Sequence, residues 1–378
     1  MSEPNRLVPP ASGDPMATAD LRRAVRRFLT EQRSAGHYRP SVDCWLSAWD
    51  EDFTRALAAQ GWIGMTVPAQ YGGHDRSFVD RFVVTEELLA GGAPVAAHWI
   101  ADRQIVPSLL RYGTAEQKQR YLPGIARGEV FFGIGMSEPD SGSDLASVRT
   151  TATRTDGGWL INGSKVWTSG AHRADAFIAL VRTSPVDPSN RHAGLSQFLI
   201  DLDAPGVRVS PIISMSGAHH FNEVFLTDVF APDTQVFGTI GKGWEQVTSE
   251  LSFERSGPER FLSTFPLLAQ LTVMNDGPEL GRLVGRIAGL HHMSAAVAGA
   301  LERRESADVA AAVVKVLGTS TEGDIAEVAS LLTGDETLCE AGWRDLVNAG
   351  LDQRPGFTLR GGTNEVLRGV IARGMGLR

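Results

Sequence analysis

The spacing of apolar residues changes twice along this chain of 378 residues, and these two changes limit its fold more than any other feature. Before Glu129, apolar residues recur at helical spacing. From Glu129, short apolar runs bounded by Gly, Pro and Asp predict strands, and helical spacing returns at Gly241. The sequence therefore predicts an α+β fold with an N-terminal helical domain (1–128), a central antiparallel β-domain (129–240) and a C-terminal helical bundle (241–378).

Local patterns predict the individual elements within these segments. Helical spacing indicates helices over residues 19–34, 47–60, 77–91, 96–112, 244–273, 277–305, 308–332 and 363–373. Short runs between turn residues indicate strands over residues 147–155, 158–168, 175–183, 194–201, 206–213 and 223–230. Thr114 and Gln117 have the spacing of a helix-start signature, and Pro258 predicts a bend or opening in helix 244–273.

Composition excludes several classes of function. A net charge of −8 without a basic run offers no footprint for nucleic-acid phosphates. The longest uncharged runs, such as 287–301, are shorter than the roughly 20 residues that span a bilayer. Cys44 and Cys339 form no metal or redox motif, and the N-terminus has no apolar signal segment. We therefore expect a cytoplasmic protein without a membrane span, a nucleic-acid partner or a bound metal.

Residues 137–144 are the strongest ligand-binding candidate in the central domain. They read Ser-Glu-Pro-Asp-Ser-Gly-Ser-Asp and follow the apolar run 130–136, which contains Gly133 and Gly135. This run predicts a buried strand that something approaches closely. Pro139 ends the strand, and the small residues after it leave backbone N–H groups for a polar or anionic ligand. The alternative is a surface turn that merely ends a strand, which turn statistics alone favour.

Two further segments favour a binding site. Residues 157–171 predict a β-hairpin whose second strand ends in Trp-Thr-Ser at 167–169. Residues 357–365 place Gly361 and Gly362 directly before a predicted helix. Glycines let the backbone approach a ligand closely, and a helix N-terminus offers unpaired N–H groups.

These three segments, in this order, resemble the acyl-CoA dehydrogenase family of flavoproteins. The resemblance runs from Gly-Trp-Ile-Gly at 61–64, through Phe-Asn-Glu-Val-Phe at 221–225, to Gly-Gly-Thr-Asn-Glu-Val-Leu-Arg-Gly at 361–369. It implies two helical domains around a central β-domain, with FAD bound between them. It also implies an acyl-CoA substrate and an acceptor of the electron-transfer flavoprotein type.

The resemblance implies roles for individual residues. Those expected to contact FAD are Ile134, Met136, Ser137, Gly142, Ser143, Trp167, Thr168, Ser169, Thr363 and Glu365. Those expected to contact the acyl-CoA are Ser143, Leu251, Arg255, Gly361 and Gly362. Taken alone, Trp167 is more often a core aromatic residue that ends a strand.

Glu254 is the candidate catalytic residue. At helical period it shares a stripe with Val247, Leu251 and Leu262, where a carboxylate is costly unless it is paired or its pKa is raised. A raised pKa is what a general base near neutral pH requires. A side chain that reaches solvent or pairs with Arg255 is the alternative, and the stripe alone leaves both open.

The family resemblance favours Glu254 as the base. In one branch of the family the base is a glutamate just before the C-terminal Gly-Thr segment, and this chain has Gly361 there. In another branch the base lies in a Glu-Arg pair on the long helix, which Glu254 and Arg255 resemble. The resemblance then implies FAD-dependent α,β-dehydrogenation of an acyl-CoA thioester to the trans-2-enoyl-CoA. The α-proton goes to Glu254 and the β-hydride to flavin N5.

Two motifs usual in the family are missing from the sequence. Neither Arg-x-x-Phe-Gly nor Gln-x-x-Gly-Gly, which hold the FAD of a neighbouring subunit, is found. We therefore expect either a homo-oligomer with other cations at the FAD or a hetero-oligomer with a second acyl-CoA dehydrogenase chain that supplies the arginine. A non-catalytic or half-site partner subunit, and a flavin-dependent oxidase or monooxygenase on the same fold, are the alternative functions.

Two histidine pairs carry weaker signals. His291 and His292 are neighbours on a predicted helix and point about 100° apart, which suits a metal ion poorly. His219 and His220 lie in a predicted loop, where they either line the substrate entrance or, as composition favours, belong to the surface.

Overall fold

The chain packs as two compact units in its computed structural model. The structure describes residues 7–10, 16–255, 257–274, 277–332 and 342–377, without the side chains of residues 250–254. Unit 1 comprises residues 1–49, 76–95 and 251–378, and unit 2 comprises residues 50–75 and 96–250. The order helical, β, helical along the chain is confirmed, whereas the domain boundaries at 128/129 and 240/241 stay predictions.

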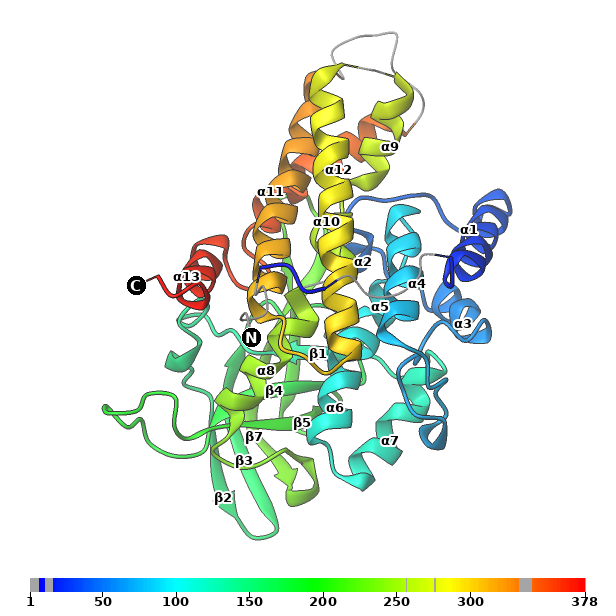
Figure 1. The fold of residues 1–378 in the computed structure, drawn as a ribbon. Helices are drawn as coiled ribbons and strands as arrows, with labels where there is room; N and C mark the ends of the chain where they lie inside the picture. Colours follow the sequence, from blue (N-terminus) through cyan, green and yellow to red (C-terminus); the bar gives the residue numbers. More distant parts are fainter. Residues whose placement is uncertain (1–6, 11–15, 256, 275–276, 333–341, 378) are drawn as a thin grey trace. The chain divides into compact units, whose positions relative to one another are not determined.

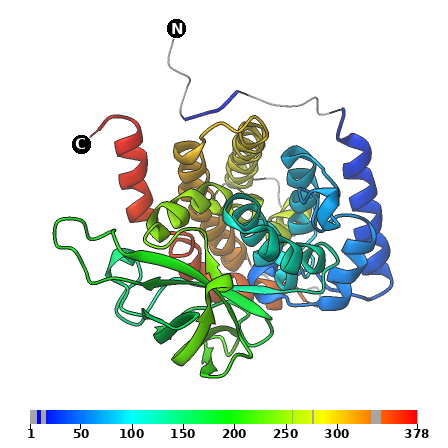
Figure 2. The same ribbon diagram turned by 90° about the horizontal axis from the view of Figure 1, so that it is seen from below.

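Unit 2 is built on an eight-stranded sheet with the strand order β6-β7-β3-β2-β4-β5-β8, and β1 pairs with β4 outside this path. The strands are β1 (Phe132–Gly135), β2 (Thr151–Thr155), β3 (Gly158–Lys165), β4 (Ala176–Arg182), β5 (Leu195–Asp201), β6 (Val207–Ile213), β7 (His219–Pro232) and β8 (Val236–Phe237). Figure 2 shows these strands, in green, as one twisted sheet. All six strands expected after residue 147 are present, and β8 is an addition.

Most pairings in the sheet are antiparallel, as predicted, but β1 runs parallel to β4. Parallel neighbours need a long connection between them. Here the chain between β1 and β4 contains the loop 137–144 and the whole β2–β3 hairpin, which is long enough for the crossover. Local patterns do not report such pairing.

The central strand β4 is buried on both faces, which explains its unbroken apolar sequence. Ile178 on one face packs in a cluster with Leu109 and Leu122 of the covering helices. Phe177 on the other face packs with Ile161 and the other side chains of the sheet's inner core. Because successive side chains of β4 point to opposite faces of the sheet, this one strand contributes to two hydrophobic clusters.

The helices of unit 2 include α3 (Glu51–Ala59), α5 (Ala96–Ile100), α6 (Val106–Tyr112), α7 (Ala115–Ala126) and most of α8 (Gly243–Arg255). The predicted helix start at Thr114 is confirmed, because its side chain accepts from Gln117 N and the Gln117 side chain accepts from Thr114 N. The expected helix 96–112 is present but contains a π-helical turn, Ala101–Ile105. Pro107 follows this turn and lacks a backbone donor, which accounts for the altered bonding.

Unit 1 is helical. Its helices are α1 (Ala19–Ser34), α2 (Cys44–Ser47), α4 (Phe78–Ala90), α9 (Phe265–Met274), α10 (Pro278–Glu302), α11 (Asp308–Leu332), α12 (Trp343–Phe357) and α13 (Asn364–Gly374). Figure 1 shows α10 and α11 side by side, and α11 also packs on α12 and α13. The sequence did not predict α12, because its Gly350 and Pro355 interrupt the helical signal.

The prediction of one helix over 244–273 is wrong. Helix α8 ends at Arg255, a 3₁₀ turn follows at Pro258–Arg260, and α9 begins at Phe265. The break itself was predicted, because Pro258 cannot donate to the carbonyl of Glu254. The gap between Arg255 and Phe265 is wider than a kink within one helix.

No helix in the described part of the chain is both long and apolar enough to cross a membrane. The same residues contain no group of three His, Cys, Asp or Glu side chains arranged to hold a metal ion. Cys44 is a buried free thiol, whereas Cys339 lies outside the described residues.

Candidate functional site

The loop 137–144 leaves β1 through a tight turn. Glu138 N donates to Ser141 O at 2.8 Å, and Ser141 N donates back to Glu138 O at 3.0 Å. Ser141 is buried, and its hydroxyl donates to the carbonyl of Asp144 at 2.8 Å. Gly142 and Ser143 are exposed at the tip, and a Cβ on Gly142 would meet nothing within 4 Å. The turn is therefore fixed by the hydrogen bonds of Glu138 and Ser141, whereas Gly142 and Ser143 at its tip are exposed.

The two glycines of β1 are explained by the protein's own side chains. A Cβ on Gly135 would lie 2.5 Å from the Phe177 ring, and a Cβ on Gly133 would lie 3.1 Å from Thr168 Cγ2. The close approach predicted for this strand is real, and Phe177 and Thr168 make it. Ile134 and Met136 are half-buried.

Residues 165–170, called here the 165–170 strip, begin at Lys165, the last residue of β3, and continue along β7. Trp167 has a left-handed backbone, φ 62°, and 55% of its surface is exposed. Its ring meets Phe221 edge-on at 5.6 Å. A bulky residue seldom adopts this φ, and such backbone strain concentrates at functional sites. The alternative reading of Trp167 as a core aromatic residue therefore does not hold.

Thr168 carries the clearest sign of a missing ligand. It is completely buried, and its Oγ1 has no hydrogen-bond partner among the described residues. A buried hydroxyl without a partner costs free energy, so it commonly meets a bound group. Together with the exposed Trp167 ring and the half-buried Ser169, it fits the polar edge and the flat face of a flavin.

A buried ion pair, which no local sequence pattern indicates, joins the loop 137–144 to the 165–170 strip. Lys165 Nζ lies 2.7 Å from Glu138 Oε1, with 0% and 6% of the two side chains exposed. Burial lowers the pKa of Lys165 to about 8. Burial also opposes the ionised Glu138, but Lys165 and the neighbouring donors outweigh it and hold the pKa of Glu138 below its usual range. Both groups are charged at pH 7.

In unit 1, the segment at Gly361 and Gly362 lies against arginines. The two glycines have φ of 65° and 84°, which favours glycine over any other residue. Arg255 Nε donates to Gly361 O at 3.1 Å, and a Cβ on Gly361 would lie 2.9 Å from the Arg260 guanidinium. The end of α8 and this glycine segment therefore lie together.

Helix α13 starts where the sequence predicted. Thr363 caps it, with Oγ1 accepting from Val366 N at 3.3 Å, and Glu365 is exposed in its first turn. Asn364 is buried and accepts from Lys315 Nζ at 2.8 Å. This fixes the helix start behind Gly361 and Gly362.

Glu254 and Leu251 belong to helix α8 by their backbone, but their side chains lie outside the described residues. Arg255, the next residue, is buried. The base assigned to Glu254 therefore stays a prediction, as do the other residue roles.

A buried charged cluster near Gly361 escaped sequence reasoning. Arg360 pairs with the fully buried Asp43 at 2.5 Å and lies over the ring of Trp45 at 4.9 Å, and Arg260 lies over the same ring at 5.1 Å. Burial raises the pKa of Glu322, which accepts from Ser263 N at 2.7 Å, to about 7. Asp43 and Arg360 are 317 residues apart and Ser263 and Glu322 are 59 apart, so no local motif contains either pair.

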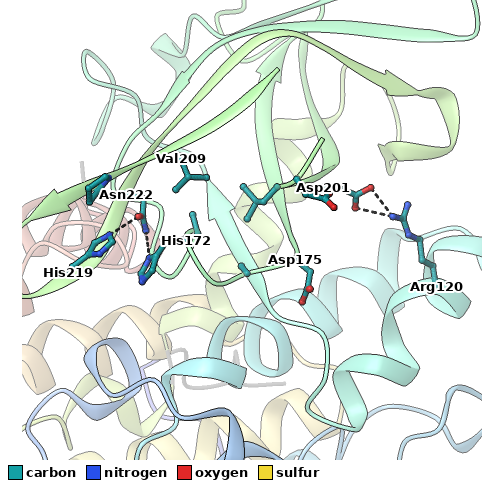
Figure 3. A pocket seen from close by; sticks show the side chains of 12 residues that line it. Arg120, His172, Asp175, Asp201, Val209, His219 and Asn222 are labelled. Carbon is teal, nitrogen blue, oxygen red and sulfur yellow. Dashed lines mark hydrogen bonds and ion pairs between the residues drawn. The ribbon is translucent and has the colours of Figure 1, made fainter. Parts of the chain in front are cut away.

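Unit 2 also has an open pocket of about 700 Å³ (Figure 3). His172 and His219 stack at 4.0 Å at one end of it, and Arg120 pairs with Asp201 at the other. Burial, together with the neighbouring His219, lowers the pKa of His172, so its imidazole is neutral at pH 7. His219 thus lines a pocket, while its neighbour His220 is buried.

In the pair His291 and His292, His291 has a structural contact. His291 hydrogen-bonds to Glu86 on α4, and that carboxylate also meets Arg22 of α1. This contact ties three helices of unit 1 together.

Three acyl-CoA dehydrogenase family models match this chain: the N-terminal domain over residues 17–129, the middle domain over 133–229 and the C-terminal domain over 278–376. The acyl-CoA dehydrogenase IpdE1 from Mycobacterium tuberculosis is 34% identical over 340 residues, which are 86% of each chain. The acyl-CoA dehydrogenase FadE34 from the same organism is 41% identical over 204 residues, which are 53% of this chain and 28% of that protein.

Solved structures agree with this assignment. The Tcur3481-Tcur3483 steroid ACAD matches with a TM-score of 0.83 at 28% identity, covering 97% of this chain and 99% of that chain. The ChsE4-ChsE5 complex from Mycobacterium tuberculosis matches with a TM-score of 0.80 at 28% identity and the same coverage. The chain therefore belongs to the acyl-CoA dehydrogenase family and is an FAD-dependent flavoprotein enzyme of lipid metabolism.

Proposed function

We propose that this chain catalyses the α,β-dehydrogenation of an acyl-CoA thioester, and that Glu254 removes the α-proton. The single observation that carries this proposal is the hydrogen bond from Arg255 Nε to Gly361 O at 3.1 Å. It brings the last residue of α8 to the glycine segment that, by family resemblance, contacts the thioester. Glu254 is the residue next to Arg255, one turn before the helix is broken at Pro258.

The residues of unit 2 have a separate task in the proposal. Thr168 would offer its unpartnered hydroxyl to the flavin, and Trp167, Met136 and Ser137 would face the edge of its ring. The exposed Gly142 and Ser143 leave room for the phosphopantetheine arm. The chemistry that bound FAD supplies is acceptance of the β-hydrogen as a hydride at N5.

The residues of unit 1 handle the thioester. A thioester α-proton is weakly acidic, so the negative charge that develops on the carbonyl oxygen needs hydrogen-bond donors. Backbone N–H groups at Gly361 and Gly362 are the proposed donors, because positive φ turns this backbone away from the usual extended path. The buried Arg255 holds the segment in place from the side of Glu254.

A second proposal concerns assembly. This chain lacks the Arg-x-x-Phe-Gly motif, and the names of two structural neighbours join two proteins, the Tcur3481-Tcur3483 steroid ACAD and the ChsE4-ChsE5 complex. We propose that a second acyl-CoA dehydrogenase chain supplies the missing arginine, with an electron-transfer flavoprotein-type protein as the electron acceptor. A half-site partner subunit without its own turnover is the alternative that this observation favours.

Anaerobic reduction by a panel of CoA thioesters tests the proposed reaction. The 450 nm band of a bound flavin should bleach, on the scale of a single turnover, with at least one fatty, branched or steroid acyl-CoA. Slow reoxidation in air would mark a dehydrogenase, and fast reoxidation an oxidase. A flavin that no thioester reduces, alone or with a partner chain present, contradicts the proposal.

A further inference from the structure

The 165–170 strip is held in an unfavourable backbone conformation. Trp167 has φ of 62° although it is neither glycine nor a residue with a short polar side chain. Its ring is 55% exposed and meets only the edge of Phe221 among the ring contacts described for it. The constraint that maintains this backbone must therefore come from the neighbouring residues.

Lys165 supplies the constraint on one side. Its ammonium group donates to Glu138 Oε1 at 2.7 Å and to Met136 O at 3.4 Å. Glu138 in turn accepts from Arg149 N at 2.6 Å and from Thr150 N at 2.9 Å. One buried ion pair thus joins the end of β1, the end of β3 and the turn before β2.

Asn222 supplies the constraint on the other side. Its carbonyl accepts from Thr168 N at 3.0 Å, and its Nδ2 donates to Thr168 O at 3.1 Å. The same amide donates to His172 Nδ1 at 3.0 Å and accepts from His219 Nε2 at 2.9 Å, as Figure 3 shows. Asn222 is completely buried and its side chain is fully bonded, so it fixes both backbone groups of Thr168.

We propose that Lys165, Glu138 and Asn222 are positioning residues for the flavin, which hold Trp167 and Thr168 in the conformation that receives the ring. The three residues do not touch the flavin in this proposal. They act through the strip, since Lys165 precedes Trp167 by two residues and Asn222 grips Thr168. The inference rests on the placement of FAD beside Trp167 and Thr168 made under the proposed function.

The charges of the ion pair matter for the choice of variants. Glu138 retains two backbone donors if Lys165 is removed, so Lys165→Met leaves a carboxylate that is still partly satisfied. Glu138→Gln leaves the buried Lys165 without its counter-charge. The double variant Lys165→Met/Glu138→Gln removes both charges and leaves neither charged group buried without its partner. It should therefore regain stability relative to the less stable single variant.

The test compares the FAD dissociation constant, the flavin spectrum and amide hydrogen exchange in these variants. Lys165→Met, Glu138→Gln and Asn222→Ala should each raise the FAD dissociation constant about 10-fold or more and blur the fine structure of the 450 nm band. The double variant should regain folding stability but keep the weakened FAD binding. Arg154→Met, which breaks the exposed pair with Asp233 in the same unit, should leave FAD binding within about twofold.

Hydrogen exchange decides the question even where wild-type FAD binding needs a partner chain. Amides of 137–144 and 166–170 should exchange at least about 10-fold faster in Lys165→Met, both segments together, while those of β4 and β5 stay protected. Lower thermal stability with unchanged FAD binding, spectrum and exchange in these segments would overturn the inference. If the wild-type protein binds flavin but no thioester reduces it, the proposed reaction is wrong. The FAD dissociation constants and the exchange rates still test the positioning role in that case.

Discussion

Glu322 has no exposed surface, and one of its carboxylate oxygens has no partner among the described residues. Burial raises its pKa to about 7. Because this pKa lies above the unfolded value, the carboxyl contributes stability that is fully present below about pH 4.5 and is lost as the pH rises through 7. Glu322 therefore makes unit 1 less stable in neutral solution than in mildly acidic solution.

Glu322→Gln should remove this loss. The amide retains the oxygen that accepts from Ser263 N and has no proton to release. Its gain in unfolding free energy over wild type should grow from pH 4.5 to 7 by up to roughly 1.4 kcal/mol per pH unit, measured by urea unfolding. Glu327→Gln, on the exposed side of the same helix, is the matched control and should give a flat difference. Parallel curves for Glu322→Gln and wild type would show that this carboxyl is ionised throughout.

The sequence points to individual candidate residues where the signal is contiguous in the chain. Trp167, Thr168, Gly361 and Gly362 were all selected because their neighbours in the chain form the motif. Glu138 also lies inside one of these motifs, but its ion pair with Lys165 could not be predicted because the two residues are 27 positions apart. Side-chain pairing over such distances depends on strand register, which local patterns do not fix.

At the scale of elements, strand β1 owes its composition to packing. Gly135→Ala should destabilise the protein by about 1–3 kcal/mol, because the added methyl group would lie 2.5 Å from the ring of Phe177 in a closed core. Gly142→Ala, where the methyl group meets open space, should change stability by less than about 0.5 kcal/mol. Denaturant midpoints of the two variants measure the difference. Equal midpoints would mean that β1 can shift away from β4 at little cost.

The elements also show where periodicity misleads. It predicted the ends of α1 correctly and merged α8 with α9, since apolar spacing continues across the break at Pro258. It missed α12, because Gly350 and Pro355 resemble loop residues when the packing of α11 against that helix is unknown. In the case of α12, tertiary contacts override local preference.

At the scale of the molecule, the family could be predicted because three motifs occur in a fixed order. Which helices belong to which of the two units could not be predicted. Helices α1, α2 and α4 pack with the C-terminal helices in unit 1, whereas α3, α5, α6 and α7 belong to the unit of the sheet. Helices that are neighbours in sequence are thus divided between the two units. No change in the spacing of apolar residues marks this division.

The missing arginine motif gives a prediction for the assembly. A diphosphate without this charge-assisted contact should bind about 10- to 150-fold more weakly, equivalent to 1.5–3 kcal/mol. The chain expressed alone should therefore contain less than one FAD per chain, and co-expression with a dehydrogenase chain that carries the motif should restore full occupancy. Flavin absorbance and mass in solution measure both quantities. A self-sufficient homo-oligomer with one tightly held FAD per chain would refute the heteromer.

The central claim is that Glu254 removes the α-proton, and solvent exchange measures that step most directly. Glu254→Gln should leave FAD content and stability unchanged but lower the rate of flavin reduction by about 10²–10⁴-fold, because a positioned base is lost. Glu245→Gln, an exposed carboxylate on the same helix, is the matched control and should behave as wild type. The decisive quantity is the rate at which the α-proton of a bound substrate exchanges with deuterated solvent. This exchange rate should fall together with the rate of flavin reduction in Glu254→Gln, and an unchanged exchange rate would show that another group is the base.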